Sequence, residues 1–89
     1  MESAKIYVGV YTYTAPDGRI QPFAIKWPDG PRYVIDEVRE MQPAASRKAG
    51  GAGMRYTIRI GERVTHLWQE PALGQKNALG EYLWFVERR

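Results

Sequence analysis

The stretch FAIKWPDGPRYVIDEV, residues 23–38, decides the fold that this sequence predicts. Phe23, Ile25 and Trp27 alternate with Ala24 and Lys26, which is the period-two pattern of a strand with one buried face. The next three residues, Pro-Asp-Gly, reverse the chain. Proline suits the first central position of a tight turn, and glycine accepts the left-handed backbone that follows. We therefore expect a β-hairpin whose first arm turns its three large apolar residues to the core.

The second arm of this hairpin changes phase. Tyr33 and Ile35 resume the alternation, but Ile35 and Val38 are three residues apart instead of two. A β-bulge near Asp36 accounts for that slip, and a bulge bends the strand that contains it. A bent hairpin is what a small barrel needs.

The rest of the chain supplies further strands and turns. Segments of strand-like composition lie at residues 5–13, 54–60, 63–70 and 81–87. The sequence Ala-Pro-Asp-Gly at 15–18 repeats the turn chemistry of 27–30, and Gly61-Glu62 suits a two-residue hairpin loop. The apolar run that includes Trp84 is expected to be covered on both faces, with Trp84 and Trp27 in the core.

The fold prediction is one all-β domain over residues 1–89. Segments 42–54 and 71–80 are rich in glycine or proline and are predicted to be irregular. In 63–70 the alternation leaves two phases open, with either Trp68 or Leu67 facing the core. The two Pro-Asp-Gly turns are twelve residues apart. Turn signals at that spacing favour a small SH3-like barrel of five or six strands, with an OB-like barrel as the alternative.

The composition restricts the environment and the chemistry. The chain has 89 residues, no cysteine and one histidine, so disulfides and thiolate metal sites are excluded. Its first residues lack the apolar core and cleavage site of a signal peptide, and no run approaches the ~18 apolar residues of a membrane span. We therefore expect a cytoplasmic protein without a cofactor or a membrane partner.

Positive charge is concentrated in one part of the chain. The net charge is +3, but residues 42–65 alone carry five basic residues and one acidic residue. This part contains the run Ser46-Arg47-Lys48-Ala49-Gly50-Gly51-Ala52-Gly53-Met54-Arg55. Glycine-rich backbone exposes N–H groups that can hold an anion, and the flanking cations add charge. The lysine precedes the glycines and a strand follows them, so the run is neither a P-loop nor a dinucleotide fingerprint.

A candidate anion or nucleic-acid site follows from this run. Its residues are Arg47, Lys48, Gly50, Gly51, Gly53, Arg55 and Arg59. Arg55 and Arg59 point the same way because they are four residues apart in one strand. The alternative is a flexible connection whose glycines only satisfy turn geometry.

Aromatic residues are the second notable feature, with three Trp, six Tyr and two Phe. Tyr7, Tyr11 and Tyr13 share one face of the first strand, and Phe85 lies in the last strand. A chain this small has too little interior to bury all of these rings, and exposed apolar patches mark contact surfaces. We therefore expect a homodimer in which these four residues contribute to the interface. An exposed platform for bases or a peptide is the alternative.

The sequence contains no recognisable catalytic set. His66 has no cysteine, serine or second histidine at a motif spacing, so acid–base or metal chemistry lacks partners. The acidic residues Asp36, Glu37 and Glu40 could pair for hydrolysis, but a charged strand edge that protects against aggregation is the favoured interpretation. We expect a protein that is not an enzyme.

Three stretches resemble small uncharacterised bacterial β-barrel proteins, chiefly from Gram-positive lineages. They are WPDGPRYVIDEV at 27–38, PAASRKAGGAGMRYTIRI at 43–60 and LWFVE at 83–87, together 35 of the 89 residues. The pattern AAS-x-KAGG-x-G-x-RYT is the most specific of them. The resemblance implies a bacterial protein of unknown function, and it transfers no functional residues.

Two functions remain from the sequence. The first is a non-enzymatic binding module for nucleic acid or another polyanion. The alternative is a protein-interaction or structural subunit that self-associates through aromatic strand faces.

Overall fold

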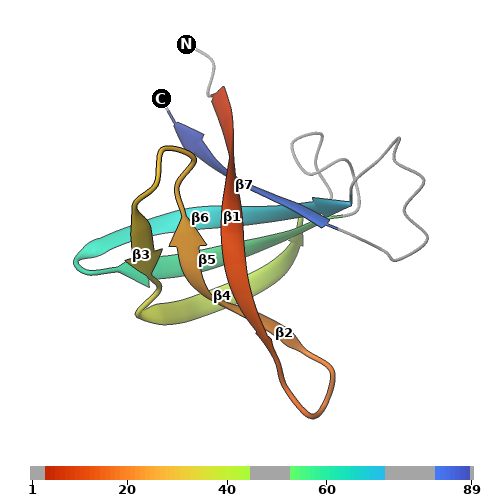
Figure 1. Cartoon of the computed structure of the whole chain (residues 1–89). Helices are drawn as coiled ribbons and strands as arrows, with labels where there is room; N and C mark the ends of the chain where they lie inside the picture. Colours follow the sequence, from red (N-terminus) through yellow and green to blue (C-terminus); the bar gives the residue numbers. More distant parts are fainter. Residues whose placement is uncertain (1–3, 45–52, 72–81, 89) are drawn as a thin grey trace.

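The computed structural model describes residues 4–44, 53–71 and 82–88, and their regular structure is entirely β-strand (Figure 1). The strands are β1 (Ala4–Thr14), β2 (Ile20–Lys26), β3 (Arg32–Val34), β4 (Glu37–Ala44), β5 (Gly53–Ile60), β6 (Arg63–Pro71) and β7 (Tyr82–Arg88). The predicted all-β class is confirmed. Among the residues described, no helix is long and apolar enough to cross a membrane.

The seven strands form one antiparallel sheet in the order β3-β2-β1-β7-β6-β5-β4. The strands β3 and β4 are its two edges, yet only Ile35 and Asp36 connect them. The Ile35 amide donates to the Phe23 carbonyl in β2 at 2.9 Å, and the Asp36 amide donates to the Arg59 carbonyl in β5 at 2.8 Å. The sheet must therefore curl until its edges meet at this link, which makes a half-barrel (Figure 1).

This link explains why the predicted count of five or six strands is too low. The run from Arg32 onward is not one bent strand, because it divides at Ile35-Asp36 into two strands on opposite edges of the sheet. The register shift in β4 falls between Val38 and Glu40 instead of near Asp36. The predicted bulge is thus misplaced, and a closed SH3-like or OB-like barrel is not confirmed.

The predicted tight turns are confirmed. Gly18 donates its amide to the Ala15 carbonyl at 2.8 Å, and Gly30 donates to the Trp27 carbonyl at 3.0 Å. Each turn therefore closes from its first to its fourth residue, with proline second and glycine last, the preference of a type I turn. Gly61, in the β5–β6 turn, has a φ of 61°, a conformation that other residues rarely adopt.

The core lies on the concave side of the sheet and draws on both halves. Its buried residues are Val8, Ile25, Ile35, Tyr56, Ile58, Leu67 and Val86. Trp27 and Trp84 pack against this cluster and remain partly exposed. Leu67 is fully buried there, which settles the phase of β6 and puts Trp68 on the opposite face.

Phe23 is the main exception to the predicted core, since 49% of its surface is exposed. Tyr11 pairs with Ala24 and Thr12 pairs with Pro22, so Phe23 has no partner on β1. This bulge moves the alternation of β2 by one residue. The prediction that Phe23 faces the core with Ile25 is therefore wrong.

Candidate functional site

The predicted anion site is only partly within the described residues. Arg47, Lys48, Gly50 and Gly51 lie outside them. Gly53 is the buried first residue of β5 and pairs with Ala44 of β4. Arg55 and Arg59 lie on the convex face of β5, as the alternation predicts.

Both of these arginines already face carboxylates of the β4 side. Arg59 Nε lies 3.2 Å from Glu37 Oε1, and Arg59 Nη1 lies 3.9 Å from Asp36 Oδ2. Arg55 Nη2 lies 3.9 Å from Glu40 Oε1. The acidic residues predicted to form a charged edge therefore offset the positive charge of β5.

The pKa of Glu37 reflects this arrangement. Hydrogen bonds from Arg39 and then Arg59 lower the pKa of the Glu37 carboxyl below its usual value. The donors are Arg39 Nε at 3.1 Å and Arg59 Nε at 3.2 Å. One exposed carboxylate is thus shared by two guanidinium groups, which leaves less charge there for an external anion.

A second group of side chains covers the convex face of β6, β7 and β1. Phe85 is fully buried, and its ring stacks on Trp68 at 5.8 Å with an interplanar angle of 2°. Tyr7 meets the Phe85 ring edge-on at a centroid distance of 5.8 Å. Of the predicted interface residues, Phe85 is therefore enclosed within the protomer, whereas Tyr7, Tyr11 and Tyr13 are exposed.

Glu70 is the polar centre of this group and is buried. Its Oε1 accepts a hydrogen bond from the Tyr7 hydroxyl at 2.6 Å, and its Oε2 lies 3.2 Å from Lys5 Nζ. The hydrogen bond to Glu70, followed by partial burial, raises the pKa of Tyr7. No local pattern in the sequence indicates this cluster, because the first and last strands, which pair to bring it together, lie at opposite ends of the chain.

Two buried hydrogen-bond donors lie at the end of this cluster. The Arg55 guanidinium lies 5.9 Å from the centre of the Trp68 ring. Arg55 Nε and Trp68 Nε1 are both buried, and neither has a hydrogen-bond partner among the residues that the structure describes.

The exposed aromatic surface lies further along the same face, on β1, β2 and β3. Tyr11 is 38%, Tyr13 54% and Phe23 49% exposed, and the Tyr11 and Phe23 rings lie 6.1 Å apart. The guanidinium of Arg32 lies 5.6 Å from the Tyr11 ring centre. Lys26 pairs directly with Arg32 across β2 and β3.

We call this surface the cationic aromatic face. It consists of Tyr11, Tyr13, Phe23, Lys26 and Arg32. Neither Lys26 nor Arg32 has an ion pair with any residue that the structure describes, in contrast to Arg39 and Arg59. The bulge that exposes Phe23 beside Tyr11 creates this face, and no local pattern in the sequence indicates the bulge.

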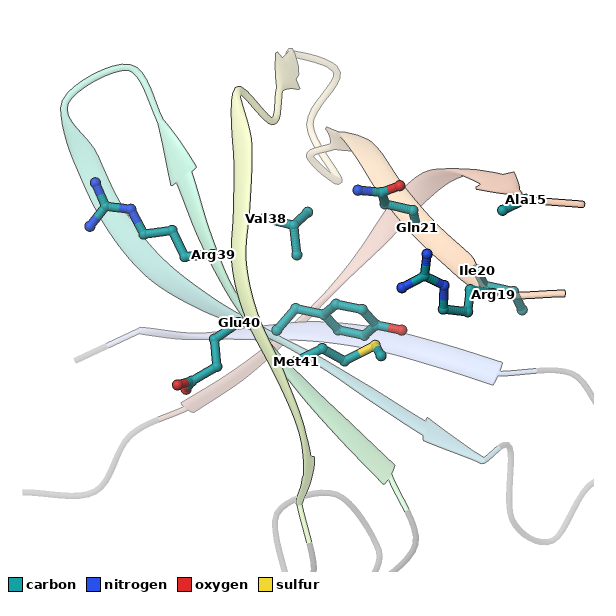
Figure 2. Close-up of a pocket in the computed structure, with 9 residues that line it drawn as sticks. Ala15, Arg19, Ile20, Gln21, Val38, Arg39, Glu40 and Met41 are labelled. Atoms are coloured by element: carbon teal, nitrogen blue, oxygen red, sulfur yellow. The ribbon is translucent and has the colours of Figure 1, made fainter. Parts of the chain in front are cut away.

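Two hollows lie along the concave side. The seam hollow, of about 240 Å³, separates β2 from β4 where the sheet edges diverge. In Figure 2, Val38 and Met41 point across it toward the β2 side, where Arg19 and Ile20 lie, whereas Arg39 and Glu40 point away. The second, which we call the hairpin hollow, has a volume of about 560 Å³ and lies between the β2–β3 and β5–β6 hairpins.

The described residues contain no group of three or more His, Asp or Glu side chains that could hold a metal ion. His66 is exposed on β6 and meets the Trp68 ring edge-on at 6.4 Å. No protein-family model, curated protein or solved structure matches this chain. The resemblance to small bacterial proteins therefore stays a prediction.

Proposed function

We propose that this protein is a non-enzymatic module that binds single-stranded nucleic acid on the cationic aromatic face. The observation that carries the proposal is the exposed Tyr11–Phe23 pair with the Arg32 guanidinium over Tyr11. Arg32 and its neighbour Lys26 have no ion pair with a described residue, so both charges can meet phosphate. This moves the expected contact from the glycine-rich segment to β1, β2 and β3.

The energetics favour a single strand over a duplex. Stacking of a base on an aromatic ring contributes about 1–3 kcal/mol, and every base offers a ring face for it. A duplex hides those faces, so Tyr11, Tyr13 and Phe23 would be left without contacts. The open surface of a sheet offers few fixed groups to read base edges, so we expect weak sequence preference.

Self-association is the second candidate, and the exposed apolar residues favour it. Val34 is 63% exposed and lies in the same cross-strand row as Tyr11 and Ala24. A second copy could cover this surface as well as a nucleic acid could. The two functions differ in their salt dependence, because apolar association lacks the release of counterions.

Fluorescence anisotropy with a labelled oligothymidine tests the proposal. With two phosphates neutralised, log affinity should fall against log salt with a slope of about −1.4. Arg32→Gln should weaken binding and bring the slope to about −0.7. Arg39→Gln removes the same charge from β4 and serves as the matched control.

Phe23→Leu completes the set, because it keeps an apolar side chain but removes the ring. It should weaken binding several-fold while leaving the salt slope unchanged. The proposal fails if the folded protein shows no saturable binding at about 50 mM salt. It also fails if Arg39→Gln and Arg32→Gln weaken binding equally. Salt-independent dimerisation detected by light scattering would favour the second candidate.

A further inference from the structure

The hairpin hollow is walled by two hairpins that do not pair with each other. Ile25, Trp27 and Tyr33 border it from the β2–β3 side. Ile60, Arg63 and Thr65 border it from the β5–β6 side. The floor is continuous with the core, because Ile25 is a core residue and Ile60 packs against the core.

Asp36 holds the two walls in place. Its amide donates to the Arg59 carbonyl at 2.8 Å, and its Oδ2 accepts from the Gly61 amide at 2.7 Å. The neighbouring Ile35 amide donates to the Phe23 carbonyl of β2. The β5–β6 turn is therefore tied to the link that also holds β2, so the hollow is preformed and a ligand need not open it.

Its size suits a small molecule. Ligand pockets are typically about 300–1,000 Å³, and mouths of barrels are a preferred place for them. The hairpin hollow, at about 560 Å³, lies within that range, whereas the seam hollow, at about 240 Å³, lies below it. The cations beside the seam hollow are also already paired, Arg19 with Asp17 and Arg39 with Glu37.

The polar groups of the hairpin hollow indicate the charge of its ligand. Arg63 has no ion pair with a described residue, and the Tyr33 and Thr65 hydroxyls have no hydrogen bond to one. Glu87 also borders the hollow, but it lies opposite Lys5 of β1 and follows the core residue Val86, so the alternation of β7 directs its carboxylate to the convex face. The charge that faces the mouth of the hollow without an ion pair to a described residue is therefore the positive charge of Arg63.

We propose that the hairpin hollow binds an amphipathic monocarboxylate. The apolar body of the ligand would lie against Ile25, Trp27 and Ile60, and its carboxylate would form an ion pair with the Arg63 guanidinium. A guanidinium matches a carboxylate with two parallel hydrogen bonds. The site uses the concave side, so it is independent of the nucleic-acid proposal, which uses the convex side.

The test uses the full chain and the fluorescent aromatic anion anilinonaphthalene sulfonate. Decanoate, decanol and decylammonium are then compared as competitors, because they share one apolar body and differ in charge. Decanoate should displace the probe at a concentration about tenfold lower than decanol, since a charge-assisted contact is worth about that factor. Decylammonium should be the weakest of the three.

Arg63→Gln should remove the preference for decanoate and leave the affinity for decanol unchanged. Arg39→Gln, which removes a charge distant from the hollow, should leave all three affinities unchanged. Cooperative urea unfolding of every variant confirms that the probe reports on the folded protein. Equal displacement by decanoate and decanol, or a preference for decylammonium, overturns the proposal. So does a decanoate preference that survives Arg63→Gln.

Discussion

Replacing Lys5 by methionine is the most informative perturbation of the convex face. It removes the cation that lies 3.2 Å from Glu70 Oε2. At that separation the attraction is about 1.3 kcal/mol in bulk water and about 5 kcal/mol at an effective dielectric constant of about 20. The Glu70 side chain is 9% exposed but that of Lys5 is 35% exposed, so the true value lies between these limits.

The ion pair also restricts the lysine side chain. Removing that restriction offsets the lost attraction by up to about 2 kcal/mol of conformational entropy. We therefore expect Lys5→Met to lower the free energy of unfolding by about 2 kcal/mol. This is well below the ~3–5 kcal/mol of a fully buried broken pair. Tyr7→Phe, which removes the other donor to Glu70, should cost about 1–2 kcal/mol.

Urea unfolding followed by tryptophan fluorescence measures these costs at neutral pH. Lys26→Met is the matched control, because Lys26 is an exposed lysine of the same sheet without an ion pair to a described residue. Its cost should stay within about 0.5 kcal/mol. The double variant of Lys5 and Tyr7 should deviate from additivity by at least about 0.5 kcal/mol, since both changes act on one carboxylate. Equal costs for the two lysines would refute this account of Glu70.

Three further predictions concern the fold. Phe85→Ala should cost about 3–5 kcal/mol in urea unfolding because the ring is fully buried, and Leu83→Ala, at a residue 44% exposed, should cost far less. Gly61→Ala should cost about 1–2 kcal/mol because of its φ of 61°, and a neutral effect would contradict the turn geometry. Finally, the lowered pKa of Glu37 stabilises the fold above pH 4.5, and this stabilisation is lost as the pH falls through the folded-state pKa. Melting temperatures should therefore show the difference between wild type and Glu37→Gln closing in acid, and a constant difference would count against the pairing.

The turns could be predicted because their chemistry is local. Pro-Asp-Gly fixes the backbone within four residues, and both turns closed as expected. The strand count could not be predicted from the sequence. The alternation changes phase near Ile35-Asp36 in the same way whether one strand bulges there or the chain divides into two strands. Only the pairing of β3 with β2 and of β4 with β5 distinguishes the two.

The candidate sites depended still more on distant pairing. The acidic residues Asp36, Glu37 and Glu40 were expected to form a charged strand edge, and the fold places them against Arg55 and Arg59 of the next strand. Glu70 carried no local signal, since its partner Lys5 lies 65 residues away. The exposure of Phe23 follows from a register shift against β1, which the sequence of β2 alone does not reveal.

The two proposed binding sites share β2 and β3 but lie on opposite sides of them. Lys26 and Arg32 form one cross-strand pair, and Ile25 and Tyr33 form the next. Successive side chains of a strand point to opposite faces, so the first pair serves the convex face and the second borders the hairpin hollow. Substitutions can therefore address either site alone. Arg63→Gln should leave oligonucleotide affinity unchanged, and Arg32→Gln should leave decanoate affinity unchanged. Loss of both activities in Arg32→Gln would mean that the short strand β3 couples the two faces, since its three residues pair on one side only with β2.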